Sequence, residues 1–363
     1  MKEFKKLLEQ NDFSKDDILS LLKSEGEDKA LLLKSSREVA DAHIGQKVFL
    51  RGLIEYSNIC SKNCFYCGIR KGNKAQTRYV MEDEEVLDCA RFAYEKSYGS
   101  IVIQTGERVD SAFTGKIEHL IRQIKELSHG ELGITLSLGE QTAETYQKWF
   151  DAGAHRYLLR IETSNPALYK RYHPGDGNHL FEERLAALER IRRAGFQLGT
   201  GVMIGLPGQS LEDLADDLLF IKQLDVDMVG MGPYIEHEDT PMFGDPELTL
   251  TKMERYQLAL NMLATLRLMM PNINMAATTA MQAIHPDGRE EAILAGANIV
   301  MPNITPLKYR ECYLLYDGKP CVDEEPDKCH EGIISRIQST GNQVGLGEWG
   351  DSRHFLAKQV DKD

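Results

Sequence analysis

The sequence of 363 residues lacks the long apolar runs that mark membrane proteins. No stretch reaches the ~18 consecutive apolar residues that a membrane span requires, and no apolar segment follows the charged residues at 1–6. We therefore expect no signal peptide, no membrane partner and a cytoplasmic location. The sequence also lacks an excess of basic residues, because 43 Lys and Arg face 56 Asp and Glu, for a formal net charge of −13. A chain this acidic does not favour nucleic acid as its partner.

Low-complexity tracts and Pro/Gly/Ser-rich linkers are absent as well, so nothing in the composition divides the chain into separate domains. What recurs is an apolar strand pattern, a loop and a helical pattern. We predict strands at 48–54, 100–104, 133–137, 156–160, 197–204, 228–231, 273–277 and 297–301. We predict helices at 84–96, 114–127, 142–152, 181–194, 211–223, 250–269 and 289–294. Several strands are apolar without alternation, as expected of parallel strands buried on both faces.

Eight alternations of strand and helix indicate an α/β fold, a closed (β/α)8 barrel of the TIM type. An open doubly wound sheet is the alternative, although no G-x-G-x-x-G fingerprint follows the first strand. We interpret residues 1–45 as an N-terminal helical extension, in which Ser14 and Asp17 form a capping box. The barrel then covers 46–304. Residues 305–363 form a C-terminal extension that closes one end of the barrel.

Three of the seven cysteines, Cys60, Cys64 and Cys67, follow the first predicted strand with the spacing C-x3-C-x2-C. Cysteines this close can hardly bridge each other, and a large cytosolic chain is kept reduced, so they are candidate metal or cluster ligands. A structural zinc or a ferredoxin cluster takes four protein ligands. Three thiolates instead leave one iron of a 4Fe-4S cluster open to an outside ligand. The alternative is a zinc loop that a distant Cys89 or His155 completes.

This motif, on the loop after the first barrel strand, resembles the radical S-adenosylmethionine (SAM) superfamily. The resemblance implies that the open iron binds the methionine part of SAM and that reductive cleavage of SAM yields a 5′-deoxyadenosyl radical. Residues expected to contact the cofactor are Tyr66, Glu107, Glu162, Arg184 and Met231. Glu107 ends a segment similar to the superfamily's G-G-E, whose acceptors meet the SAM ammonium. Glu162 is expected at the ribose or amino group, Arg184 at the carboxylate and Met231 at the adenine.

Longer segments resemble the FeFe-hydrogenase maturases of the HydE type, at 135–140, 157–166, 205–209, 276–281 and 296–303. The resemblance runs from about residue 10 to beyond 330. It implies a role in assembling the two-iron part of the hydrogenase active site. The expected substrate is a small anionic iron–cysteine complex that carries carbonyl and cyanide ligands. Matching positions that would bind it are Thr135, Arg160, Met228, Thr278, Thr279 and Tyr313. Implied partners are a flavodoxin- or ferredoxin-type electron donor and other hydrogenase maturases.

The sequence departs from this family pattern near its C-terminus. Some members carry C-x7-C-x2-C there for an accessory cluster. Cys321 and Cys329 keep the first spacing, but Gly332 stands at the third position. Neither His330 nor Cys312 has the spacing to replace that ligand. We therefore expect no stable second cluster.

Two other enzymes of the same barrel group are alternatives. A biotin-synthase-like enzyme needs a second, sacrificial cluster, and we find no ligand set for one inside the predicted barrel. A methylornithine synthase needs carboxylate partners for the ammonium groups of lysine, whereas Arg160 and the threonines suit an anion. A further alternative is a divergent relative of HydE in an organism that has no FeFe hydrogenase. A non-catalytic iron–sulfur protein is a hypothesis of a different class, which SAM binding would separate from the others.

Overall fold

The computed structural model describes residues 2–360 and contains the predicted barrel. Within these residues, eight parallel strands lie in the order β10-β1-β2-β3-β4-β5-β7-β9. Their bounds are β1 Lys47–Ser57, β2 Ser100–Thr105, β3 Gly133–Ser137, β4 Arg156–Leu158, β5 Gln197–Thr200, β7 Met228–Val229, β9 Asn274–Met275 and β10 Ile299–Val300. The amide of Asn298 donates to the carbonyl of Met275 at 2.9 Å. The amide of Ala277 donates to Ile299 at the same distance, so hydrogen bonds also join the two outer strands. Each of the eight predicted strands overlaps one of these strands.

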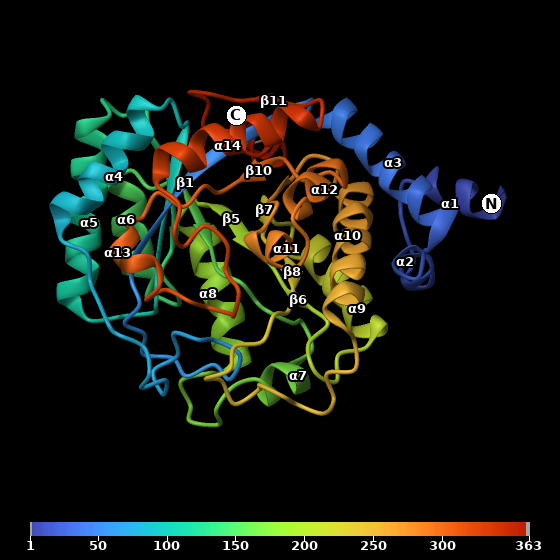
Figure 1. Ribbon diagram of the computed structural model, residues 1–363, viewed down its shortest axis with the longest axis horizontal. Helices are drawn as coiled ribbons and strands as arrows, with labels where there is room; N and C mark the ends of the chain where they lie inside the picture. The colour runs from blue at the N-terminus through green and yellow to red at the C-terminus, as the bar shows by residue number, and fades with distance from the viewer. Residues whose placement is uncertain (1, 361–363) are drawn as a thin grey trace.

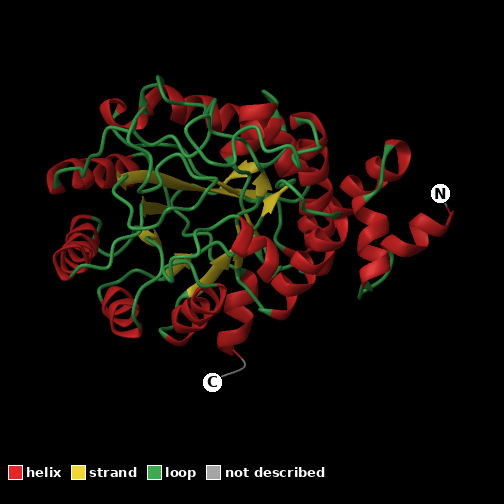
Figure 2. Cartoon of the chain, turned by 90° about the horizontal axis from the view of Figure 1, so that it is seen from below, coloured by secondary structure: helices red, strands yellow, loops and turns green. Residues whose placement is uncertain are grey.

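Helices surround these strands on the outside (Figures 1 and 2). Seven of them correspond to the predicted helices: α4 Asp83–Glu95, α5 Ser111–Leu127, α6 Ala143–Asp151, α8 Phe181–Arg193, α9 Leu211–Gln223, α10 Lys252–Met269 and α12 Gly288–Leu294. In α5, Ile117, Leu120 and Ile124 are fully buried. Their spacing of three and four residues places them on one face, which packs toward the strands. The short helices α7 Pro166–Arg171 and α11 Thr279–Ile284 were not predicted.

The N-terminal extension consists of α1 Lys2–Leu8, α2 Lys15–Leu22 and α3 Gly26–His43, which lie against the α9–α10 side of the barrel (Figure 1). The predicted capping box at the start of α2 is confirmed. Ser14 Oγ accepts from the amide of Asp17 at 3.2 Å, and the Asp17 carboxylate accepts from the amide of Ser14 at 2.9 Å. Because α2 and α3 cover the outer face of α10, that helix is buried on nearly all sides from Leu258 to Met269.

The fifth and sixth predicted strands differ from expectation because each is interrupted. After β5 and β7 the chain forms two further short strands, β6 Met203–Ile204 and β8 Gly232–Pro233, which pair with each other beyond the ring. Gly201 and Gly230 stand at the interruptions. A Cβ atom on Gly201 would lie 2.0 Å from the carbonyl oxygen of Gly230, so only glycine permits this approach of the two backbones.

The C-terminal extension contacts both ends of the barrel, not one end as expected. It contains α13 Leu307–Arg310, α14 Pro326–Ser339, β11 Gln343–Val344 and α15 Arg353–Val360. Its early part, residues 313–319, reaches the carboxyl ends of the strands. Its later part pairs β11 with the start of β1. At that amino end, the carbonyl of Gly350 accepts from buried Arg51 at 3.2 Å, and Asp351 accepts from buried Arg156 at 2.7 Å.

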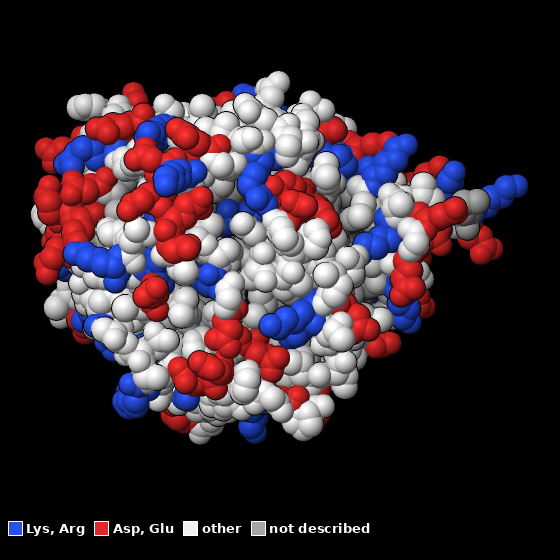
Figure 3. All heavy atoms as spheres, viewed as in Figure 1, with Lys and Arg blue, Asp and Glu red and all other residues white. Residues whose placement is uncertain are grey.

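No helix among residues 2–360 combines the length and apolarity needed to cross a bilayer. On the face shown in Figure 3, acidic and basic side chains are interleaved, and acidic ones gather on the side formed by α4 and α5. This distribution agrees with the negative net charge of the sequence.

Candidate active site

The carboxyl ends of the barrel strands surround a cavity of about 330 Å³. Its walls come from β1, β2, the loops after β1 and β4, the 230–235 segment, the start of α11 and the 313–319 segment of the C-terminal extension. Small-molecule sites have volumes of this order, and in (β/α)8 barrels the catalytic groups lie at this end. The cavity is therefore the candidate active site.

The three clustered cysteines, Cys60, Cys64 and Cys67, all line this cavity. The amide of Glu107 donates to Cys60 Sγ at 3.3 Å. Burial raises the pKa of each thiol, that of Cys64 to about 12, and a bound cation would offset this effect by favouring the thiolates. Three thiols that line one cavity fit a cluster held through three of its irons.

The two residues considered as a fourth ligand, Cys89 and His155, lie away from this group. Cys89 lies on α4, where its thiol donates to the carbonyl of Ile304 at 3.2 Å, outside the cavity. His155 lies at the amino end of the barrel. Its ring lies against Trp349 with the centroids 4.4 Å apart and the planes inclined by 32°, and its Nε2 is 3.3 Å from Asp351. Neither residue reaches the cysteine loop, so the structure does not support a zinc loop completed by Cys89 or His155.

Beside the cysteine loop, Glu107 and Arg184 belong to a network of four buried charges. Lys62 Nζ lies 3.3 Å from Glu107 and 2.7 Å from Glu140. Arg184 Nε donates to Glu140 at 2.5 Å, and Glu107 accepts from the amide of Glu140 at 2.8 Å. Burial and the nearby Glu140 raise the pKa of Glu107. Burial alone would raise the pKa of Glu140 too, but Arg184 and Lys62 hold it below its usual value.

The sequence prediction missed Lys62 and Glu140. Lys62 lies between two of the cluster cysteines, and Glu140 ends the segment 135–140, so position alone was a signal for both. The network presents ammonium, guanidinium and carboxylate groups next to the cysteine loop. Such a set suits a zwitterion like an amino acid, whose two charged ends need opposite partners.

Glu162 and Arg160, which were predicted to bind different ligands, form one ion pair with an N–O distance of 3.1 Å. Arg160 also donates to the carbonyl of Val202 at 2.8 Å. Burial raises the pKa of Glu162. Its φ of 68° is left-handed, a conformation that costs energy for a residue with a side chain and that is common at functional sites. The predicted Tyr66 also lines the cavity, with its hydroxyl 3.2 Å from Nε2 of His173.

Four of the six predicted substrate residues line the same cavity: Arg160, Thr278, Thr279 and Tyr313. Thr279 Oγ1 accepts from the hydroxyl of Tyr316 at 2.8 Å. Thr278 Oγ1 is buried, and the described residues offer it no hydrogen-bond partner. An unpaired buried hydroxyl costs about 1–3 kcal/mol, which a ligand at this position would recover. Thr278 is thus the clearest sign of a ligand-binding group on this wall.

The structure corrects the expectation for Met231. Its side chain is fully buried in the hydrophobic core, outside the cavity. The neighbouring Gly230 and Gly232 line the cavity instead. Successive residues of an extended chain point to opposite sides, so Met231 faces away from any ligand there.

Thr135 and Met228 also differ from expectation, because neither lines the cavity. Thr135 lies in the middle of β3, and its hydroxyl accepts from Arg156 Nε at 3.1 Å. Met228 lies at the start of β7, and its sulfur accepts from Arg51 Nη1 at 3.1 Å. Both residues therefore contact buried arginines, Arg156 and Arg51, near the amino end of the barrel.

A second missed feature is a buried ion pair inside the cavity. Lys319, from the C-terminal extension, pairs with Glu55 on β1, and both side chains line the cavity. Lys319 also donates to the carbonyl of Tyr313 at 2.8 Å. The two charged residues are 264 positions apart, so no local pattern in the sequence announces the contact.

Cys321 and Cys329 lie together, outside the cavity. His330, which was considered as a substitute ligand, instead has its Nδ1 3.1 Å from the hydroxyl of Tyr98. Cys312 is likewise outside the group that these two cysteines form.

Known proteins resemble this chain both in sequence and in fold. Residues 54–221 match the family model of the radical SAM superfamily. The chain is 41% identical over 358 residues to the FeFe hydrogenase maturase subunit HydE of Thermotoga maritima, a match that covers 98% of both chains. The crystal structure of methylornithine synthase, PylB, has a TM-score of 0.79 at 24% identity and covers 98% of this chain and 99% of its own. HydG, a maturase of FeFe hydrogenase from Carboxydothermus hydrogenoformans, has a TM-score of 0.79 at 20% identity, with 98% and 82% covered.

Proposed function

Because the chain belongs to the radical SAM superfamily and, within it, to the family of the FeFe-hydrogenase maturase HydE, we propose that it acts on a small anionic iron complex during hydrogenase assembly. It is a radical SAM enzyme that uses a 4Fe-4S cluster and SAM. When bound, these cofactors supply a 5′-deoxyadenosyl radical. The proposed substrate is an iron–cysteine complex with carbonyl and cyanide ligands.

The charge of the cavity is the observation that carries this substrate class. Among the described residues, the cavity is lined by the cations Lys62, Arg160, Arg184 and Lys319 and the carboxylates Glu55, Glu107 and Glu162. Glu140 pairs with both Lys62 and Arg184, so four cations and four carboxylates balance here, although the whole chain carries a net charge of −13. Each of these carboxylates has a cationic partner in the protein. Because no carboxylate is left unpaired for a cationic ligand, whereas the Thr278 hydroxyl has no partner, the site favours an anion.

The residues nearest the cysteine loop are proposed to hold the cofactors. Cys60, Cys64 and Cys67 would bind the cluster. Lys62, Glu107 and Arg184 present charges of both signs beside them, which suits the amino and carboxylate ends of SAM. Glu162 and Tyr66 also line the cavity and are proposed to orient the remainder of SAM. The burial of these groups keeps water away from a reactive intermediate.

Thr278, Thr279, Tyr313 and Arg160 are proposed to hold the substrate. The Thr278 hydroxyl is free to donate, and Arg160 supplies a fixed positive charge. Thr135 and Met228 lie deeper in the barrel against Arg156 and Arg51. We propose that they support the floor of the substrate site without touching the ligand.

Methylornithine synthase is the second candidate, since its structure superposes on nearly the whole chain. A lysine substrate brings two ammonium groups. The partners that they need would have to come from carboxylates that already pair with Lys62, Arg160 or Lys319. The charge of the cavity therefore favours the first proposal.

An anaerobic cleavage assay tests the proposal. The cluster-loaded protein is reduced with dithionite and given SAM, and 5′-deoxyadenosine and adenosylated products are followed with the synthetic iron–cysteine complex, with lysine, and with neither. We expect a new product only with the iron complex. Turnover of lysine, or cleavage indifferent to both compounds, would contradict the substrate assignment.

Two cysteine variants serve as matched controls in this assay. Cys64→Ala should abolish SAM cleavage, because the cluster loses one of its three ligands. Cys89→Ala removes a buried thiol outside the cavity and should retain cleavage. Full cleavage by Cys64→Ala would overturn the assignment of the cluster site.

A further inference from the structure

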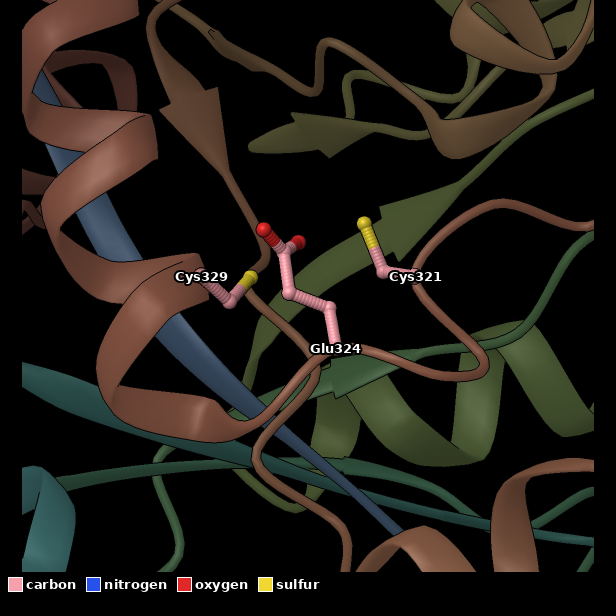
Figure 4. Close-up of side chains that lie close together, drawn as sticks. All are labelled: Cys321, Glu324 and Cys329. Atoms are coloured by element: carbon pink, nitrogen blue, oxygen red, sulfur yellow. The ribbon is translucent and has the colours of Figure 1, made fainter.

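Apart from the barrel cavity, two thiols and a carboxylate of the C-terminal extension converge on one small space (Figure 4). The Sγ atoms of Cys321 and Cys329 and a carboxylate oxygen of Glu324 all lie within 4.8 Å of one another. Cys329 is buried in the first turns of α14, Cys321 is half-buried, and Glu324 is exposed on the loop between them. In the view of Figure 4 the carboxylate lies between the two sulfur atoms.

We propose that Cys321, Glu324 and Cys329 bind a single divalent cation of the zinc type. Thiolates select soft cations, and zinc takes four ligands in a tetrahedron, with bonds of about 2.3 Å to sulfur and about 2.0 Å to oxygen. Ligand atoms around such an ion are separated by about 3–4 Å. The three ligand atoms therefore need to approach one another by about 1–2 Å at most, and the exposed side chain of Glu324 has room to move. Water completes the coordination.

The loop that carries these ligands is held in place by a buried arginine. Arg310, at the end of α13, donates through Nη1 to the carbonyl of Cys321 at 2.8 Å and to that of Glu324 at 2.6 Å. Its Nε donates to the carbonyl of Thr305, at the end of the barrel. Cys321 itself has a left-handed φ of 62°, a costly conformation that these bonds help to maintain. Two ligands are thus fixed in backbone position before any ion binds, which lowers the ordering cost of binding.

The charge around the site also suits a thiolate-rich ion. Two thiolates and a carboxylate around a divalent cation leave one net negative charge. The guanidinium group of Arg310, which is bonded to the carbonyls of Cys321 and Glu324, compensates this charge. A cluster is not favoured here, since it needs more thiolates than these two and Gly332 offers no side chain.

Such an ion would cross-link two parts of the C-terminal extension. The ion would join the loop that follows Lys319 to the first turns of α14, which packs on α12 and β11. The proposal is independent of the substrate, because the site shares no residue with the cavity.

Zinc binding is tested on the protein with its barrel cluster already loaded, under anaerobic conditions. After addition of Zn²⁺ and gel filtration, we expect one zinc per chain. X-ray absorption at the zinc edge, which does not detect iron, should show two sulfur neighbours at about 2.3 Å and lighter atoms at about 2.0 Å. Zinc should also raise the thermal midpoint of the wild-type protein.

Matched variants separate this site from other thiols. Cys321→Ser and Cys329→Ser should lose the bound zinc and the thermal shift, and Glu324→Gln should bind zinc at least about tenfold more weakly. Cys312→Ser, in the same extension but outside the group, should behave like the wild type. All four variants should retain SAM cleavage. Three sulfur neighbours at zinc, zinc retained by Cys329→Ser, a Cys321–Cys329 disulfide in place of zinc, or additional iron and sulfide that Cys321→Ser removes would each overturn the proposal.

Discussion

Replacing Lys319 with methionine tests whether a buried ion pair secures the C-terminal extension over the cavity. The side chains of Lys319 and Glu55 are only 5% and 2% exposed. Methionine keeps most of the apolar stem of the lysine and removes its charge. Glu55 then keeps one side-chain donor, Nδ2 of Asn303 at 3.1 Å. Removing one partner of a buried ion pair costs about 3–5 kcal/mol, because the other charge is left uncompensated.

Thermal unfolding of the cluster-loaded protein measures this cost. At about 2 °C per kcal/mol for a chain of this size, Lys319→Met should lower the midpoint by about 6–10 °C at pH 8. The double variant Glu55→Gln/Lys319→Met should unfold at a higher temperature than Lys319→Met, because it contains no unpaired charge.

Lys308 provides the matched control. It pairs with Glu85, but its side chain is 63% exposed. Pairs of this kind contribute about 0–1 kcal/mol, so Lys308→Met should shift the midpoint by about 2 °C or less. Equal losses in Lys319→Met and the double variant would refute the reasoning, since the cost would then come from packing and not from charge.

Two further predictions concern the cavity wall and the amino end of the barrel. Thr278→Val keeps the shape of the side chain and removes the unpaired hydroxyl, so it should weaken binding of the iron complex about tenfold and leave SAM binding unchanged. The thermal midpoint of the ligand-free protein should rise by about 2–6 °C, because an unpaired buried hydroxyl is removed. Titration of each ligand checks the first expectation, and equal weakening of SAM would contradict it. Burial lowers the pKa of His155 to about 3, below the ordinary 6.5 of the unfolded chain. Between these values the unfolded chain binds a proton that the folded protein does not, so stability falls as pH falls from 6.5 toward 3. Between pH 7 and pH 5 the free energy of unfolding, measured with urea, should therefore fall by about 2 kcal/mol less in His155→Gln than in the wild type. Equal decreases in the two proteins would show that His155 is not responsible.

The barrel was predictable because each strand and helix has a local signature. Buried parallel strands are short apolar runs, and α5 shows its buried face in the spacing of Ile117, Leu120 and Ile124. The interruptions after β5 and β7 were not predicted, although Gly201 and Gly230 mark them. Their effect depends on how closely two backbones approach, which only the folded chain shows.

The candidate site was predictable where chemistry is clustered in sequence. The cysteine loop, Glu107 and Thr278 all follow strands, and the carboxyl ends of parallel strands meet at one edge. Met231 was misassigned because the alternation of side chains within 230–232 turns it into the core, and the flanking glycines were the available sign. The pairing of Lys319 with Glu55 depends on two segments far apart in the chain, so no window of sequence contains it.

The position of the C-terminal extension has a consequence for the order of events during synthesis. Residues 60–67 leave the ribosome more than 200 positions before the 313–319 segment that covers the cavity. At ~5–20 residues per second, this interval lasts on the order of tens of seconds. Residues 343–351, which close the opposite end, emerge later still. The nascent chain therefore completes its cysteine loop early and its two covers last, so the cavity stays open to iron until the final segments have been synthesised.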